Sequence, residues 1–224
     1  MAREDYQKAL KKGERSYARY LSEGKYPYLQ VLEELLSHTD VVAEEDLGIC
    51  SIPSELIVGT FTAGRRTAFA PNFMPLLDEE SEFAAKWQAL YNAHLEEGIH
   101  DPIKCYEFMN RYYVLEGNKR VSVLKFCGAP SVQGNVTRII PKRTDEPENR
   151  LYFEFLAFYK YSKVTLYSAS LEAIGFYWKN LDLRQIIDGQ TMIAWRSALC
   201  MSALKRYIRK REENDRRFRQ QMPF

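Results

Sequence analysis

Five consecutive residues, Glu116-Gly117-Asn118-Lys119-Arg120, have the types and order that could hold a phosphate group. The surrounding pattern predicts a strand that ends at Glu116 and a helix that begins at Asn118, with a glycine between them. The first N–H groups of a helix have no partners within the helix, and the helix dipole is positive at that end. Such a turn can therefore bind an anion. Lys119 and Arg120 add positive charge, and an arginine can grip two phosphate oxygens at once.

Glu116 is the catalytic candidate of this turn, because its carboxylate could contact a metal ion, a ribose hydroxyl or Arg120. In a nucleotide hydrolase or phosphotransferase it would serve as the base or as a metal contact. The plain alternative is an ordinary glycine turn that carries a solvated basic pair. A motif this short counts only in the right structural setting.

The other groups that could do chemistry favour structural roles. Three adjacent acids, Asp78 to Glu80, stand near an expected helix start and complement the helix dipole better than they form a metal site. His94 lies on an apolar stripe, so we expect a core histidine with its hydrogen bonds satisfied. The spacing of these residue types indicates no Ser-His-Asp or Cys-His arrangement. The four cysteines form no Cys-x-x-Cys pair, which predicts reduced and mostly buried thiols and no metal site.

The C-terminal stretch is basic. Positive charge gathers on an expected helix at Lys205, Arg206, Arg209, Lys210 and Arg211, and three more arginines follow. Such a face can bind the phosphates of DNA or RNA. Three acidic residues between positions 212 and 215 dilute this charge, so a solvated helix end is the alternative.

The composition is that of an ordinary soluble protein. The chain has 224 residues, of which 46% are hydrophobic and 28% charged, and its net charge is +2. Overall charge therefore does not demand a nucleic-acid partner. No run reaches the roughly 18 apolar residues that span a bilayer, and the first residues lack the apolar core of a signal peptide. We expect a cytoplasmic protein that does not contact membranes.

Periodicity predicts the elements that position the turn. Apolar residues at steps of three and four predict helices over about 6–21, 28–36, 78–97 and 118–127. Shorter apolar runs predict strands over 47–58, 102–106, 112–115 and 136–140. A loop of small residues over 60–66 ends in Arg65 and Arg66.

These elements predict an α/β (α+β) fold with a small mixed sheet and flanking helices. We expect a helical N-terminal extension over 1–46 and the sheet domain over 47–141. A charged linker over 142–150 then leads to a mostly helical C-terminal region that ends in the basic tail.

The order of these elements resembles that of a known superfamily. The strand ending in Ile52-Pro53 leads to an arginine-bearing loop, and a long helix ends at Gly98. Pro102-Ile103 follows, and then a strand runs into the Gly117 turn. This arrangement is similar to the N-terminal nucleotide-binding domain of the ParB/sulfiredoxin superfamily, which also opens some longer bacterial proteins. The resemblance covers roughly residues 47–141.

The resemblance implies roles for particular residues. Gly117 and Arg120 match the Gly-x-x-Arg that grips phosphate in the family, and Arg65 or Arg66 matches its upstream arginine. Asn118 stands where chromosome-partitioning ParB proteins have a glutamate that assists CTP hydrolysis and where sulfiredoxins have the catalytic cysteine. Asparagine can do neither job, so binding fits this chain better than catalysis.

Three hypotheses follow for function. In the first, a ParB-like switch module, associated with DNA, binds a nucleoside triphosphate with or without Mg²⁺, and occupancy orders the loop over 60–66. The second is a hydrolase or phosphotransferase that uses the same pocket. The third is a non-enzymatic interaction or nucleic-acid-binding protein that acts through the basic tail. A nucleotide is the expected partner, and the first hypothesis also admits a homodimer.

Overall fold

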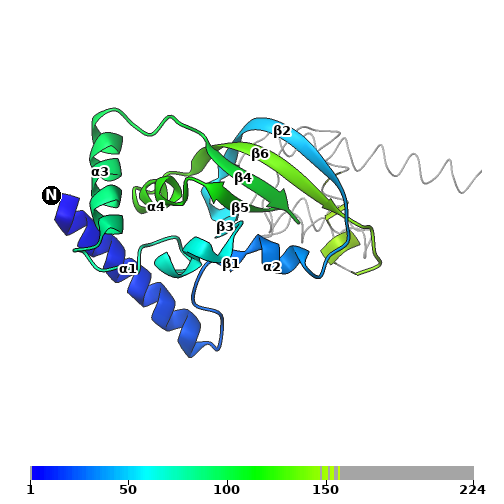
Figure 1. Ribbon diagram of the computed structural model, residues 1–224, viewed down its shortest axis with the longest axis horizontal. Coiled ribbons are helices and arrows are strands. Elements are labelled where there is room, and N and C mark those ends of the chain that lie inside the picture. Colours follow the sequence, from blue (N-terminus) through cyan, green and yellow to red (C-terminus); the bar gives the residue numbers. More distant parts are fainter. Residues whose placement is uncertain (1, 147, 151, 154–155, 157–224) are drawn as a thin grey trace, which may run out of the picture. The chain divides into compact units, whose positions relative to one another are not determined.

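The computed structural model describes residues 2–146, 148–150, 152–153 and 156 (Figure 1). The chain divides into two compact units, residues 1–142 and 143–224. In the second unit, residues 148–150 are helical, within the stretch expected to be a linker. The basic tail, with Lys205, Arg206, Arg209, Lys210 and Arg211, lies outside the described residues.

The first unit is an α/β fold with a mixed sheet, as predicted, and this sheet has six strands where the sequence predicts four. The strands are β1 (Gln30–Val31), β2 (Val41–Pro53), β3 (Ile57–Thr60), β4 (Ile103–Phe108), β5 (Arg111–Glu116) and β6 (Ser131–Pro141). Their order in the sheet is β1-β3-β5-β4-β6-β2. The β4–β5 and β2–β6 pairs are antiparallel, and the other three pairs are parallel.

Helices flank the sheet, as Figure 1 shows. They are α1 (Ala2–Ser22), α2 (Leu32–Leu36), α3 (Glu82–Glu96) and α4 (Asn118–Phe126), with short 3-10 turns η1 (Ser54–Leu56) and η2 (Ala63–Ala68). The predicted helices over 6–21, 78–97 and 118–127 are confirmed to within a few residues at their ends. Only the last five residues of the predicted 28–36 helix are helical.

The β4–β5 hairpin turns at two residues with a left-handed backbone, of which Asn110 is of a type that favours this conformation. Met109 and Asn110 have φ values of 53° and 58°, which suits a two-residue hairpin between twisted strands. The Glu107 carboxylate accepts a hydrogen bond from the Asn110 amide at 2.6 Å. The turn between β4 and β5 therefore lies at Met109-Asn110.

Two strands lie within the stretch expected to be a helical extension. β1 occupies 30–31, and β2 begins at Val41 rather than near 47. β2 pairs with β6 all the way from Val41 to Pro53, so β6 in turn begins at Ser131 rather than near 136. Most side chains of β2 are exposed, and its first half is acidic. The strand is therefore defined by its partner's hydrogen bonds and not by an apolar pattern of its own.

Trp87 joins the helices. Its ring meets Tyr6 of α1 edge to face, with centroids 5.4 Å apart, and stacks on Tyr91 at the same distance. Its indole N–H donates to the Ser122 hydroxyl of α4 at 2.9 Å. Since Trp87 and Tyr6 are both fully buried, α1 shares the apolar core of α3 and α4.

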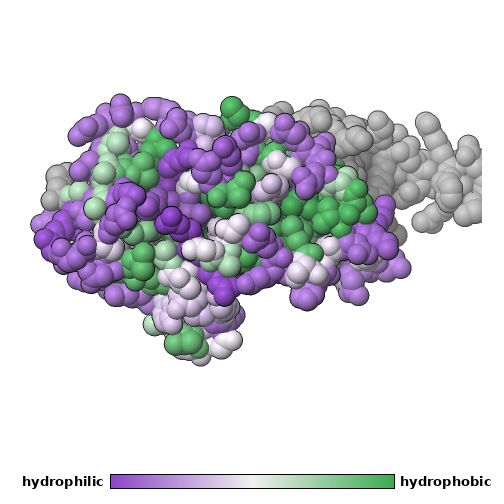
Figure 2. Space-filling view, in the orientation of Figure 1, coloured by the Kyte–Doolittle hydropathy of each residue, from purple (hydrophilic) through white to green (hydrophobic). Residues whose placement is uncertain are grey.

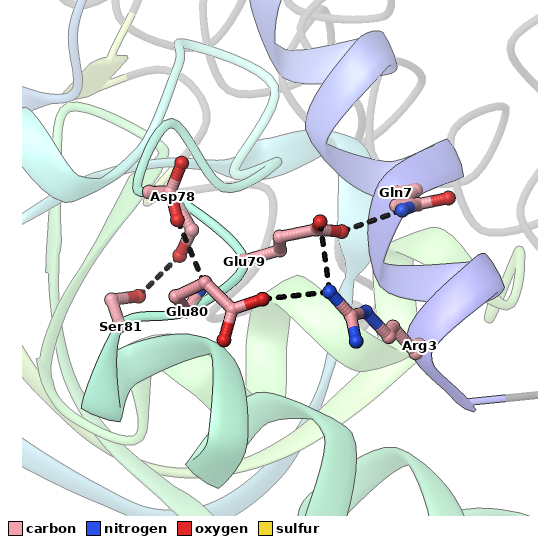
Figure 3. A network of polar contacts seen from close by, with 6 residues as sticks. All are labelled: Arg3, Gln7, Asp78, Glu79, Glu80 and Ser81. Atoms are coloured by element: carbon pink, nitrogen blue, oxygen red, sulfur yellow. Dashed lines mark hydrogen bonds and ion pairs between the residues drawn. The ribbon is translucent and has the colours of Figure 1, made fainter.

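The acidic run before α3 fastens α1 to the rest of the fold (Figure 3). Arg3 contacts Glu79 at 3.1 Å and Glu80 at 2.6 Å, and the Gln7 amide donates to Glu79 at 2.5 Å. Asp78 instead accepts from the Glu80 amide at 2.8 Å. Two of the three acids therefore bind α1 side chains, a contact that sequence reasoning did not foresee.

The end of the predicted apolar stripe on α3 differs from expectation. His94 is only half-buried, and its Nδ1 atom is buried with no hydrogen-bond partner among the described residues. Leu95 is 53% exposed. The prediction of a satisfied core histidine is therefore wrong, because the last turn of α3 extends past the core that Trp87 fills.

The three described cysteines are free thiols, but only Cys105 is buried; Cys50 is half-buried and Cys127 exposed. The expectation of mostly buried thiols is wrong for these three, and Cys200 lies outside the described residues.

Hydrophilic residues cover most of the face in Figure 2, with smaller hydrophobic areas among them. Within the described part of the chain, every helix is too short or too polar to span a membrane.

We expect Gly59→Ala to destabilise the protein by about 1 to 3 kcal/mol, the usual cost of overpacking. A Cβ on Gly59 would lie 2.3 Å from the Gln30 carbonyl oxygen and 2.8 Å from the Tyr113 ring, which forces β1 away from β3. Urea unfolding followed by circular dichroism measures the change. Gly64→Ala is the matched control, because a Cβ there meets nothing within 4 Å. Equal stability of the two variants would contradict the pairing of β1.

Lys125, at the end of α4, should make stability depend on pH. Burial lowers the pKa of its amine to about 8, and the amine donates to the Ile57 carbonyl at 2.7 Å. Between pH 8 and its ordinary pKa of 10.5 the unfolded chain holds this proton and the folded protein does not, so the contribution of Lys125 to the unfolding free energy rises with pH.

The comparison with Lys125→Met isolates this effect, because all other titrating groups are shared. As pH rises from 7 to 10.5, we expect the unfolding free energy of wild type to rise relative to that of the variant. The rise should be about 1.4 kcal/mol for each unit by which burial lowers the pKa of Lys125. Urea unfolding at several pH values measures the gap. A gap that stays constant would show that Lys125 is not held in a desolvated site.

Candidate functional site

The predicted anion site lies where β5 passes into α4. Gly117 is the N-cap of α4 with φ 106°, a left-handed conformation that favours glycine. A Cβ there would also lie 2.7 Å from the Ile103 side chain. Gly117 has no side chain that could cap the helix, so within the described residues the first amides of α4 find no acceptor in their N-cap residue. The strand–glycine–helix turn is therefore present as the sequence predicts.

Arg65 is close enough to Lys119 for its charge to act on the lysine. The Lys119 amine lies 4.9 Å above the Phe83 ring of α3. Partial burial lowers the pKa of Lys119, and the neighbouring charges of Arg65 and Lys86 lower it further. Neither Lys119 nor Arg65 forms an ion pair among the residues that the structure describes. Two predicted ligands thus lie near each other beside an uncapped helix N-terminus.

Arg66 faces a different neighbourhood. Its guanidinium pairs with Glu34 of α2 and lies 5.7 Å above the Tyr26 ring. Of the two adjacent arginines, Arg65 is the one whose charge reaches Lys119, and Arg66 links η2 to α2. The sequence left this choice open, because both residues lie in the same short turn.

Arg120 reaches back across Gly117. Its Nη1 atom donates to the carbonyl oxygens of Asp101 and Pro102 at 3.0 and 2.7 Å, and Nη2 lies 3.7 Å from Glu116. The side chain is only 20% exposed. In this structure Arg120 therefore ties the start of α4 to the segment before β4.

Glu116 is engaged in ion pairs. Its carboxylate lies 2.8 Å from the Lys104 amine and 3.7 Å from Arg120. The hydrogen bond and charge of Lys104, together with the charge of Arg120, lower the pKa of Glu116. A carboxylate with a lowered pKa is a weaker proton acceptor, which does not favour Glu116 as a general base.

Asn118 contacts β3 from the first position of α4. Its amide nitrogen lies 3.4 Å from the Thr60 hydroxyl, and the Thr60 hydroxyl donates to the Val114 carbonyl. The Oδ1 atom of Asn118 is buried and has no hydrogen-bond partner among the described residues. Asn118 therefore holds a buried acceptor, unpaired within the described residues, at the first position of α4.

Two charged residues of α3 that sequence reasoning missed lie next to this site. Lys86 and Glu82 form an ion pair of 2.5 Å that lowers the pKa of Glu82, and the charges of Lys119 and Arg65 lower it further. Their spacing of four residues on a helix was visible in the sequence. What the sequence did not show is that the first turn of α3 lies beside the first turn of α4.

The described residues contain no group of three His, Cys, Asp or Glu side chains that could hold a metal ion. His100 contacts the Glu97 carbonyl oxygen at 2.6 Å. A comparison with models of protein families finds no match for this chain, and a comparison with curated proteins finds none either.

We expect Arg120→Ala to lower the free energy of unfolding by about 1.5 to 3 kcal/mol, because it removes charge-assisted hydrogen bonds to two carbonyl groups. Arg15→Ala, which removes an exposed arginine of α1, should change stability by less than about 0.5 kcal/mol. Urea unfolding of both variants measures the difference. If Arg120→Ala is as stable as Arg15→Ala, Arg120 does not anchor the turn and is available for a ligand.

Proposed function

We propose that residues 1–142 form a ParB-like nucleotide-binding module, with the phosphates held at the N-terminus of α4. The observation that carries this proposal is the uncapped first turn of α4 beside Lys119 and Arg65. Open amides and the helix dipole attract an anion, and two cations without an ion-pair partner in the described part of the chain strengthen that attraction.

The arrangement of the fold supports the ParB/sulfiredoxin-like interpretation. β3 leads directly into η2, which carries Arg65, and β5 leads directly into α4. β3 and β5 are parallel neighbours, so their carboxyl ends meet at the same edge of the sheet. Ligands of α/β proteins bind in the crevice outside such strand ends. We assign phosphate contact to Lys119, Arg65 and the amides of the first turn of α4.

Binding without catalysis fits this site better than hydrolysis. Asn118 can accept or donate hydrogen bonds but cannot act as a base or nucleophile. Glu116 is held by Lys104 and Arg120, and its pKa is lowered. A module that binds a nucleoside triphosphate and signals its presence through η2 needs neither chemistry. The proposed association with DNA rests on the family resemblance.

The test is calorimetric titration of the full chain with CTP, ATP and GTP, with and without Mg²⁺. We expect saturable binding of at least one nucleotide. Lys119→Ala and Arg65→Ala should each weaken it about tenfold or more, because each removes a charge-assisted contact, and the double variant should abolish it.

Lys11→Ala, which removes an exposed lysine of α1, is the matched control and should bind as wild type does. Unfolding temperatures of all variants should stay close to that of wild type, since Lys119 and Arg65 form no ion pair within the described residues. Unchanged affinity in the double variant would place the nucleotide elsewhere. No binding of any nucleotide to wild type would overturn the proposed function.

A further inference from the structure

Four charged side chains from three elements gather beside the first turn of α4. Arg65 comes from η2, Lys119 from α4, and Glu82 and Lys86 from the first turns of α3. Lys119 lies over Phe83, the neighbour of Glu82, and the Lys86 amine lies 2.5 Å from the Glu82 carboxylate. Arg65 is close enough for its charge to act on both Lys119 and Glu82. We call these four residues the charge quartet.

The charge quartet is unbalanced. Three cations and one carboxylate leave an excess of two positive charges, and the dipole of α4 adds to it. A phosphomonoester or terminal phosphate carries a charge of about −1.5 to −2 at neutral pH. A phosphodiester carries only one negative charge. The excess therefore matches a terminal phosphate better than a phosphate that is esterified on both sides.

The Glu82–Lys86 pair is one that a ligand can break. Its side chains are 80% and 62% exposed, and exposed pairs four residues apart on a helix contribute only about 0.3 to 0.5 kcal/mol. The carboxylate of Glu82 occupies Lys86 in the way that a ligand anion would. A phosphate with two charges and three terminal oxygens offers Lys86 a stronger partner than one carboxylate does.

We propose that the charge quartet selects ligands that end in a dianionic phosphate, with Lys86 passing from Glu82 to the ligand and Glu82 acting as a built-in competitor that weakens binding. This inference rests on the proposed function, because it names the part of the nucleotide that the site recognises. It adds Lys86 as a ligand-binding residue from α3 and gives Glu82 a regulatory role. Removing Lys86 and removing Glu82 should therefore change affinity in opposite directions.

The test uses two matched probes, methyl phosphate and dimethyl phosphate, titrated into the full chain at pH 7.5 and followed by the amide NMR signals of Asn118 to Arg120. We expect methyl phosphate to bind on the order of tenfold more tightly than dimethyl phosphate, because it carries the second charge. Glu82→Gln should tighten methyl phosphate binding about two- to fivefold, and Lys86→Gln should weaken it by a similar factor.

Asp5→Asn and Lys8→Gln are the matched controls. Asp5 and Lys8 form a 2.7 Å ion pair on α1, and Asp5 lies near Cys127, just after the opposite end of α4. These two changes alter the net charge as the test variants do and should leave affinity unchanged. If Glu82→Gln or Lys86→Gln changes the affinity for methyl phosphate no more than its control does, the Glu82–Lys86 pair is an ordinary helix contact. The proposal is then overturned.

The nucleotide titration separates the two possible failures. If wild type binds a nucleotide through Lys119 and Arg65 but does not distinguish methyl from dimethyl phosphate, only the selection by the charge quartet fails. If wild type binds neither a nucleotide nor methyl phosphate, the proposed function fails with it.

Discussion

The geometry of this unit depends on the reversal of the chain at Gly117. The backbone there has φ 106°, and the Ile103 side chain leaves no room for a Cβ. Because the turn is this tight, α4 begins directly after β5, at the sheet edge where β3 also ends. Arg120 then holds the turn closed by donating to the carbonyl groups of the segment before β4. An uncapped helix N-terminus at the end of two parallel strands is the result.

The aromatic core around Trp87 decides what stands opposite that helix end. Trp87 joins α3 to α1 through Tyr6 and to α4 through Ser122. This packing places the first turn of α3 beside the first turn of α4, so that Lys119 lies over Phe83. Arg3 and Gln7 of α1 secure the segment before α3 from the outside (Figure 3). The charges that surround the site are therefore set by apolar contacts some distance from it.

Ion pairing divides the charged residues of the Gly117 turn and of η2 into two groups. Glu116, Arg120 and Arg66 have partners within the protein: Glu116 and Arg120 with each other and their neighbours, Arg66 with Glu34. Lys119 and Arg65 form no ion pair with any residue that the structure describes, although they lie near each other. Keeping an excess of cations together costs stability, and such an arrangement is typical of sites that bind an anion.

Local features of the sequence determined helices α1, α3 and α4, the β4–β5 hairpin and the Gly117 turn. Apolar periodicity and glycine act over a few neighbouring residues, so they can be read without knowing the fold. Tertiary structure alone decided the length of β2, the place of β1, the choice between Arg65 and Arg66, and the presence of Glu82 and Lys86 at the site. A strand at the sheet edge forms through hydrogen bonds to its partner strand. The ion pairs of a charged side chain depend on which distant residue lies beside it. Neither of these partners is a neighbour in the sequence.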